Sequence, residues 1–161
     1  MNSNKALMHL IRPINLGLIV LIQILCFMVF CGDSSIASFS LGILFPTLFT
    51  AVAGYIINNY FDLKKDKANG KPILKLFNNK AWLGLYLGLN AVALLLCFWQ
   101  QNGLLPWVLG IQSMLLVYAY ALSNWLLIGN VVVSIMAVSV VAILYLSNAV
   151  FCNLGQLWVL L

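Results

Sequence analysis

The sequence predicts an all-α fold, a multi-pass transmembrane bundle of about five helices with the start of a sixth. Hydrophobic residues make up 64% of the 161 residues and charged residues only 7%, whereas a soluble domain has about 25% charged residues. Apolar runs long enough to cross a bilayer, about 20 residues each, recur along the chain. All the lysine and arginine residues also fall where alternate crossings put them on one side of a membrane.

Each predicted helix is an apolar run bounded by polar or turn-forming residues. The predicted spans are 14–31, 36–61, 81–99, 104–122 and 125–146, and residues 147–161 begin a further apolar segment. The hydrophilic stretch 62–80 contains Asn69-Gly70 and Lys71-Pro72, which favour the end of a helix. We therefore expect the whole chain, 1–161, to form a single membrane-embedded domain.

The charge distribution predicts an orientation. With this order of spans, the N-terminus, the 62–80 loop and the turn at 123–124 share one side, and that side holds Lys5, Arg12 and every other lysine. The positive-inside rule then predicts a protein of the cytoplasmic (inner) membrane with the 62–80 loop in the cytoplasm. Topology and anionic lipid headgroups explain the net charge of +5. We expect no nucleic-acid partner.

One dense polar cluster stands out, formed by Asn58, Asp62 and Asp66 at the end of the second predicted span. Their spacing aligns the three side chains on one face of an α-helix. The two carboxylates repel each other there, and the negative end of the helix dipole disfavours both. A divalent cation reverses these effects, and Mg²⁺ suits oxygen ligands shared with phosphate groups. Lys71 downstream would then neutralise phosphate oxygens.

The same segment has a second interpretation. Asp62 and Asp66 lie among Lys64, Lys65 and Lys67, so the acids could pair with these lysines in a solvated loop. Exposed pairs of this kind contribute about 0–1 kcal/mol. The charge pattern alone leaves both the magnesium site and the solvated loop open.

Other polar and small residues within the spans have structural interpretations. The four cysteines lack metal-binding spacing, and His9 has no nearby cysteine or histidine, which argues against a transition-metal site. Gly84 and Gly88 are predicted to let helices approach closely. The predicted interhelical hydrogen-bonding residues are Gln23, Asn90, Gln112 and Asn148.

The residues around the cluster carry a family resemblance. Asn58, Asp62 and Asp66 are followed by Asn69 and by Lys71-Pro72, and this order resembles the first signature of the UbiA superfamily of intramembrane prenyltransferases. The start of the chain around Arg12-Pro13-Ile14-Asn15 and the region 118–133 also resemble the family. Residues 88–90 and 127–133 look closest to the geranylgeranylglycerol-phosphate geranylgeranyltransferase branch. The quinone, menaquinone and haem branches of the family remain alternatives.

The resemblance implies a transferase of isoprenoid and lipid biosynthesis. Members use Mg²⁺ to transfer a polyprenyl group, such as geranylgeranyl, from its diphosphate to a lipid or aromatic acceptor within the bilayer. Carried over to this chain, Asp62 and Asp66 are the catalytic carboxylates and, with Asn58, the metal ligands. The implied contacts to the diphosphate or the prenyl chain are Asn58, Lys71, Tyr118 and Arg12, with Asn15 a further candidate beside Arg12.

The chain departs from the family pattern in three places. Asn59 stands where many members have Asp, and the segment 123–125 stands where a basic pair often follows the fourth helix. The third departure concerns the second Asp motif, because Asp33, Asp62 and Asp66 are the only aspartates. We therefore expect this chain alone to lack full activity. We expect a truncated product, a half completed by a second chain, or a non-catalytic remnant or membrane assembly partner.

Overall fold

The part of the chain that the structure describes is entirely α-helical. The computed structural model describes residues 11–31, 41–68, 79–100, 104–121, 131 and 134–143, and no strand occurs among them. The helices are α2 (Pro13–Cys31), α3 (Leu41–Ala68), α4 (Asn79–Gln100), α5 (Leu105–Tyr120) and an unlabelled helix, Ser134–Ile143. The all-α prediction is thereby confirmed for these residues.

The helix boundaries follow the predicted spans with one difference. α2, α4 and α5 begin and end within a few residues of the predicted ranges. α3, however, continues beyond the predicted end at residue 61 as far as Ala68. Residues 62–68 contain no glycine or proline and include leucine, lysine and alanine, which favour helix. Asp62 and Asp66 therefore lie on helical backbone, as their spacing predicts, although they fall beyond the predicted end of the span.

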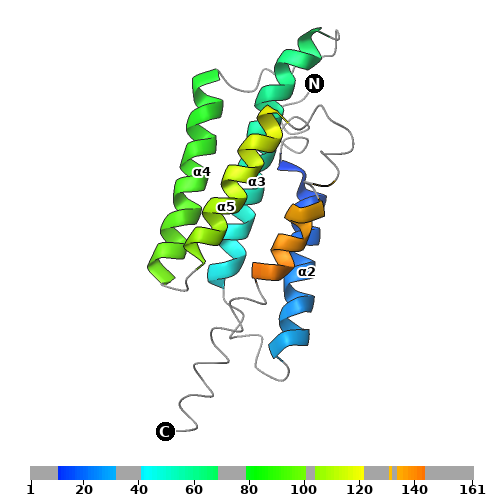
Figure 1. The fold of residues 1–161 in the computed structure, drawn as a ribbon, viewed down its shortest axis with the longest axis vertical. Helices are drawn as coiled ribbons and strands as arrows, with labels where there is room; N and C mark the ends of the chain where they lie inside the picture. The colour runs from blue at the N-terminus through cyan, green and yellow to red at the C-terminus, as the bar shows by residue number, and fades with distance from the viewer. Residues whose placement is uncertain are drawn as a thin grey trace, which may run out of the picture.

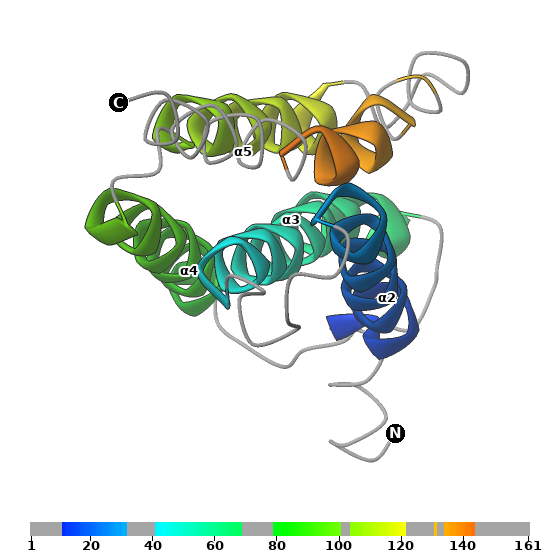
Figure 2. The same ribbon diagram turned by 90° about the horizontal axis from the view of Figure 1, so that it is seen from below.

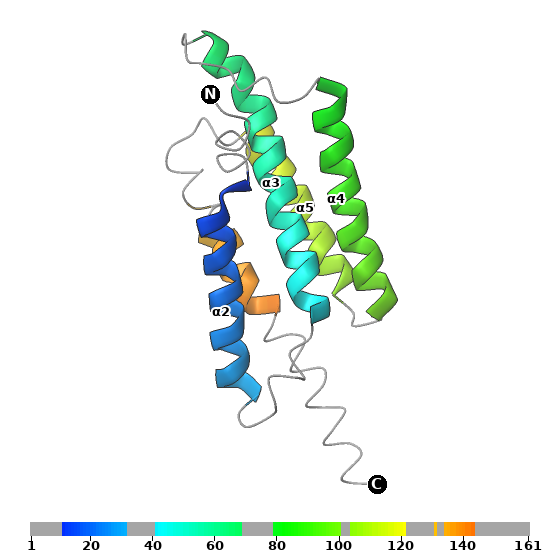
Figure 3. The ribbon, with the colours of Figure 1, turned by 180° about the vertical axis from the view of Figure 1, so that it is seen from behind.

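The helices run roughly along the long axis of the molecule, and α3 is the central one (Figure 1). α3 packs most extensively against α4, then α5 and then α2. Seen along the axis, α4, α3 and α2 form one row, and α5 and the 134–143 helix lie over it as a second row (Figure 2). From behind, α2 and α4 flank α3 (Figure 3). One face of α3 is thus turned toward the second row.

Two buried apolar clusters hold these helices together. The first joins α3, α4 and α5 and consists of Ala53, Ile56, Ile57, Trp82, Tyr86 and Ala119. The second also includes the 134–143 helix and consists of Ile43, Cys97, Leu104, Val108 and Ile143. Cys97 is a buried free thiol in this apolar cluster, as its apolar sequence context predicts.

The described helices bury polar side chains and expose large apolar ones. On α4, Leu87, Leu95 and Phe98 are 56%, 66% and 72% exposed. The buried polar residues are Gln23, Thr50, Asn90, Gln112 and Ser139. Two of the described helical segments, Gly42–Leu63 and Lys80–Trp99, are long and apolar enough to cross a membrane.

Gln23 joins α2 to α3, as predicted. Its Nε2 donates a hydrogen bond to Thr47 Oγ1 at 3.0 Å, and that hydroxyl donates to the Ile43 carbonyl at 2.7 Å. Gln23 is fully buried, and its Oε1 has no hydrogen-bond partner among the described residues. Asn148, predicted to act in the same way, lies outside the described residues.

Gln112 joins α5 to two other helices. Its Nε2 lies 3.4 Å from Thr50 Oγ1 on α3 and 3.3 Å from the Asn90 carbonyl oxygen on α4. The Asn90 side chain instead donates to the Tyr86 carbonyl of its own helix at 3.0 Å. The interhelical role is thus confirmed for Gln112, whereas Asn90 takes part through its backbone.

The close helix approach lies at Gly54 and not at the predicted glycines. A Cβ added to Gly54 would lie 2.9 Å from a methyl carbon of Leu115 on α5. No described atom lies within 4 Å of a Cβ built on Gly84 or Gly88. Small residues four apart mark a smooth helix face, but they do not determine which neighbour covers it.

Candidate functional site

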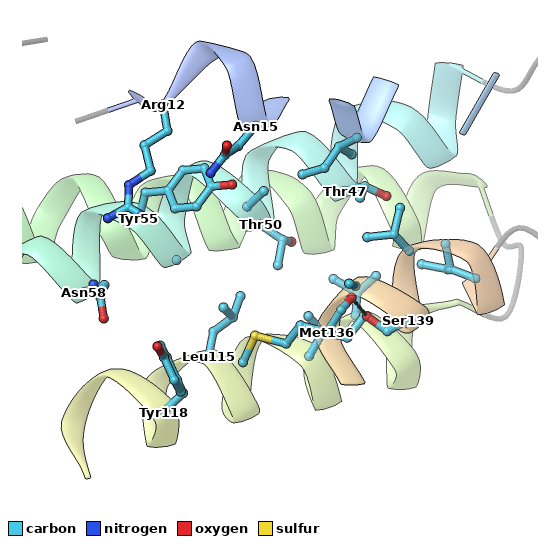
Figure 4. A pocket seen from close by; sticks show the side chains of 18 of the residues that line it. Arg12, Asn15, Thr47, Thr50, Tyr55, Asn58, Leu115, Tyr118, Met136 and Ser139 are labelled. Atoms are coloured by element: carbon cyan, nitrogen blue, oxygen red, sulfur yellow. Dashed lines mark hydrogen bonds between the residues drawn. The ribbon is translucent and has the colours of Figure 1, made fainter. Parts of the chain in front are cut away.

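A cavity of about 360 Å³ lies between α2, α3, α5 and the 134–143 helix (Figure 4). Its volume falls within the range of about 300–1,000 Å³ that is typical of small-molecule sites. The wall formed by α3 consists of Thr47, Thr50, Ala51, Gly54, Tyr55 and Asn58. Steps of three and four residues place these side chains on one face of the helix. The cavity therefore follows α3 over several turns.

Polar side chains gather at one end of the cavity. Arg12 and Asn15 come from the start of α2, Tyr55 and Asn58 from α3, and Tyr118 from α5 (Figure 4). The other end is lined mainly by aliphatic residues of α5 and the 134–143 helix, namely Val108, Ile111, Val140 and Ile143. The cavity is thus amphipathic along its length.

Hydroxyl groups interrupt the apolar end at three places. Thr47 Oγ1 and Ser139 Oγ donate hydrogen bonds to carbonyls of their own helices, at 2.7 Å and 2.6 Å. Thr50 Oγ1 is the acceptor for Gln112. Because the hydrogens of Thr47 and Ser139 are used within their helices, neither hydroxyl is free to donate a hydrogen bond to a ligand.

Asn58 connects the cavity to Asp62. Its Nδ2 donates a hydrogen bond to Asp62 Oδ2 at 2.9 Å. An ionised carboxylate only accepts hydrogen bonds, so this contact fixes the orientation of the amide. The other amide atom, Oδ1, is buried without a hydrogen-bond partner among the described residues, and Figure 4 shows the side chain facing the cavity. Because an unpaired buried acceptor costs about 1–3 kcal/mol, this oxygen favours a ligand that donates a hydrogen bond, or a cation.

Arg12 is directed to the same end by an unusual turn. Its φ is 49°, a left-handed conformation that costs about 1–3 kcal/mol for a residue other than glycine. The Arg12 carbonyl accepts hydrogen bonds from the amides of Asn15 and Leu16 at 2.9 Å and 3.2 Å, while Pro13 takes the first helical position, where no N–H is needed. The guanidinium lies 5.3 Å from the centre of the Tyr55 ring, within cation–π range. The turn thus holds a permanent positive charge beside the cavity.

The structure places several of the predicted site residues together at the cavity. Arg12 from the turn before α2, Asn58 from α3 and Tyr118 from α5 all line the cavity at its polar end. Asn15, the further candidate beside Arg12, lines the same end. Arg12 approaches Tyr55, a residue that the sequence motif does not include.

The predicted carboxylates are described in part. Asp62 lies one turn beyond Asn58 on α3 and is joined to it by the 2.9 Å hydrogen bond. Asp66 lies on the α3 backbone, but its side chain is outside the described residues, and so is Lys71. No group of three or more His, Cys, Asp or Glu side chains that could hold a metal occurs in the described part of the chain. Of the three predicted metal ligands, the described side chains are therefore those of Asn58 and Asp62.

The sequence motif does not include most of the cavity wall. For α3 a signal was present, since counting back from Asn58 in steps of three and four reaches Tyr55, Gly54 and Thr50. For the 134–143 helix there was none, because Met136 and Ser139 stand in an apolar run that gives no indication of which face meets α3.

Comparison of the chain with protein-family models, with curated proteins and with solved structures finds no match. The resemblance to the UbiA superfamily therefore stays a prediction.

Proposed function

We propose that this protein is a membrane-embedded relative of the UbiA-type prenyltransferases, and that its cavity binds a prenyl diphosphate such as geranylgeranyl diphosphate together with Mg²⁺. The observation that carries the proposal is the polarity of the cavity. A guanidinium and an unpaired amide oxygen lie at one end, and aliphatic side chains line the other. A ligand with a charged headgroup and a long apolar tail matches this arrangement, because each part meets groups of its own kind.

A membrane setting is supported by the distribution of side chains on the described helices, which expose large apolar residues and bury polar ones. Polar residues within a bilayer face the interior of a helix bundle, as Gln23, Asn90 and Gln112 do here. The outer face of α4 carries Leu87, Leu95 and Phe98, for which lipid is a suitable solvent. We infer a multi-pass bundle in the cytoplasmic membrane, with the Asp-containing end of α3 on the cytoplasmic side.

Asn58 and Asp62 fit a magnesium site in their chemistry. Mg²⁺ takes oxygen ligands and is commonly held by one or two carboxylates together with substrate phosphates. Asp66, one further helical turn along α3, would supply the second carboxylate of the motif. Bound Mg²⁺ stabilises the negative charge of a diphosphate leaving group. Asn58 contributes by presenting Oδ1 to the cavity and by holding Asp62 through its hydrogen bond.

The other residues of the polar end complete the proposed headgroup site. Arg12 offers a guanidinium, which forms strong charge-assisted hydrogen bonds to phosphate oxygens. Tyr118 adds a phenol from the α5 side, and the resemblance assigns Lys71 to the same headgroup. At the other end, the aliphatic wall from Val108 to Ile143 would hold the isoprenoid tail and exclude water from it.

We propose that this chain binds the prenyl diphosphate, which is the donor in the transfer reaction. Transfer to a lipid or aromatic acceptor calls for a second Asp motif, and the proposed partner in turnover is a chain or segment that carries one. A second candidate is a non-catalytic assembly protein that keeps the cavity and its ligand.

The test is retention of radiolabelled geranylgeranyl diphosphate by the protein purified in detergent, with Mg²⁺ or with a chelator. We expect retention that requires Mg²⁺ and falls about tenfold or more in Asp62→Ala, since one charged contact contributes about 1.5–3 kcal/mol. Asn59→Leu is the matched control, because the Asn59 amide donates to the Tyr55 carbonyl of its own helix at 2.7 Å.

Equal retention by the wild type and Asp62→Ala would contradict the proposed role of the motif. Retention that persists without any transfer to added acceptor, even when a chain with a second Asp motif is supplied, favours the non-catalytic candidate.

A further inference from the structure

We propose that Leu115 of α5, packed on Gly54 of α3, forms a constriction in the cavity and determines how bulky a tail can pass from the polar end to the apolar end. This inference rests on the proposed function, because it concerns the chain of the same ligand. It assigns a role in specificity to two residues outside the polar cluster of Asn58, Asp62 and Asp66.

The contact between these two residues depends on glycine at position 54. A Cβ on Gly54 would lie 2.9 Å from Leu115 Cδ2 and 3.2 Å from Cδ1. A separation of 2.9 Å between carbon atoms is well inside the optimal 3.5–4.0 Å, so the Leu115 methyl groups occupy the space that a side chain at position 54 would take. At Gly17, Gly84, Gly88 and Gly110, by contrast, no described atom lies within 4 Å of an added Cβ.

Leu115 lies between the two ends of the cavity on the α5 side. Tyr118, about one turn further along α5, belongs to the polar end, and Ile111, one turn back, belongs to the apolar end. Figure 4 shows the Leu115 side chain between those of Tyr118 and Met136, pointing toward α3. A ligand that reaches from one end to the other therefore passes Leu115.

Gly54 takes the corresponding position on the α3 side. Asn58 follows it by one turn toward the polar end, and Thr50 precedes it by one turn toward the apolar end. Gly54 is buried and lines the cavity itself. Leu115 and Gly54 are thus in contact at one level of the cavity, and a ligand that passes this level, between the headgroup site and the tail site, runs beside that contact.

The geometry predicts opposite effects for changes at the two positions. Leu115→Ala removes the methyl groups at this level and widens the passage. Gly54→Ala adds a methyl group where Leu115 now packs, so the flexible end of the leucine must move away from α3 and narrow the passage. If Leu115 is already alanine, the added methyl group at position 54 meets no leucine methyl groups, and the two substitutions are coupled.

The experiment compares two Mg²⁺-dependent ligands. One is geranylgeranyl diphosphate, which has a slim tail, and the other is a prenyl diphosphate analogue that ends in a naphthyl group. Retention of both is measured for the wild type, Leu115→Ala, Gly54→Ala and the double variant. Leu116→Ala on the same helix is the control, since Leu116 is 40% exposed and does not line the cavity.

We expect Leu115→Ala to raise retention of the naphthyl analogue relative to geranylgeranyl diphosphate about tenfold, as a change of a few methyl groups in an apolar pocket does. Gly54→Ala is expected to lower retention of both ligands, and of the analogue more. In the double variant most of that loss should disappear. Leu116→Ala should leave the ratio unchanged.

An unchanged ratio in Leu115→Ala, while the wild type retains geranylgeranyl diphosphate normally, would overturn the constriction and leave the proposed function intact. A Gly54→Ala loss that is equally large with or without Leu115 would also overturn it, because displacement of whole helices would then be the cause. If the wild type retains neither ligand, the proposed function fails, and the inference fails with it.

Discussion

Asn58 has two roles that only an amide can combine. Its Nδ2 donates to the Asp62 carboxylate at 2.9 Å, and its Oδ1 stays unpaired beside the cavity. An aspartate at this position could not donate, and a leucine could neither donate nor accept. The neutral amide therefore keeps one carboxylate in place without adding a second negative charge at the same turn.

Asn58→Asp is expected to destabilise the protein by about 1–2 kcal/mol when no divalent cation is present, because a hydrogen bond to a charged group is lost and two like charges lie four residues apart. Mg²⁺ should then raise the melting temperature of the variant more than that of the wild type. Thermal unfolding in detergent at increasing Mg²⁺ concentration measures both effects. Asn58→Leu, which keeps Asp62 and Asp66, should respond to Mg²⁺ less than the wild type, and equal shifts in all three proteins would contradict a cation at this position.

At the level of single residues, the sequence predicts local neighbours and misses distant ones. Asn58 and Asp62 are neighbours because they are four apart on a helix, which the spacing alone indicates. The position of Arg12 over Tyr55 depends on the turn at Arg12, where φ is 49°. No residue type in the segment predicts that conformation, since arginine does not favour it.

Two buried glutamines hold helices together in different ways. Gln112 donates toward an acceptor on each of two neighbouring helices. Gln23 makes one interhelical hydrogen bond and leaves Oε1 buried without a described partner. Since an unpaired buried acceptor offsets the benefit of the bond on the other amide atom, the two residues should contribute differently to stability.

We expect Gln112→Leu to lower the free energy of unfolding by about 1–2 kcal/mol, the upper range for hydrogen bonds between helices in membranes. Gln23→Leu should be neutral or slightly stabilising, because Thr47 keeps its hydrogen bond to the Ile43 carbonyl and the unpaired oxygen is removed. Denaturant or thermal unfolding in the same detergent compares the two variants. A larger loss for Gln23→Leu than for Gln112→Leu would contradict this account.

At the level of helices, the boundaries were more predictable than the contacts. The apolar runs predict α2, α4 and α5 to within a few residues because length and hydropathy are properties of each segment alone. The predicted span ends at residue 61, because a change to charged residues indicates the end of a membrane span, whereas the spacing of Asn58, Asp62 and Asp66 predicts helix beyond it, and α3 does continue to Ala68. The close approach at Gly54 was missed because it depends on Leu115, far along the chain.

The described helices have the opposite arrangement to a soluble protein, with large apolar residues on the outside and polar residues inside. Large apolar residues of α2 and α4 are exposed, while glutamine, asparagine and threonine side chains are buried. Soluble monomers rarely expose extended apolar surface. The described structure therefore favours lipid around these helices, whereas the side of the membrane on which α3 ends remains a prediction from the charge distribution.

Leu87→Arg tests the membrane setting, because Leu87 is 56% exposed near the middle of α4. An arginine at the centre of a spanning helix costs about 2.5–3.5 kcal/mol, so we expect a smaller fraction of the protein in membranes after alkaline extraction. Trp99→Arg is the matched control, since Trp99 is near the helix end, where a long cationic side chain can reach the interface. A Leu87→Arg protein that is soluble and folded without detergent would contradict the setting.

The central claim is that a prenyl diphosphate lies in the cavity with its tail past Gly54, and photolabelling measures this most directly. A geranylgeranyl diphosphate analogue with a photoreactive group on its last isoprene unit is irradiated with the protein, and the labelled residues are identified by mass spectrometry. We predict Mg²⁺-dependent labelling, displaced by unlabelled geranylgeranyl diphosphate, at residues around Val108 and Ile143. Labelling that is not displaced, or that falls on the exposed face of α4 around Leu87 and Leu95, would contradict the claim.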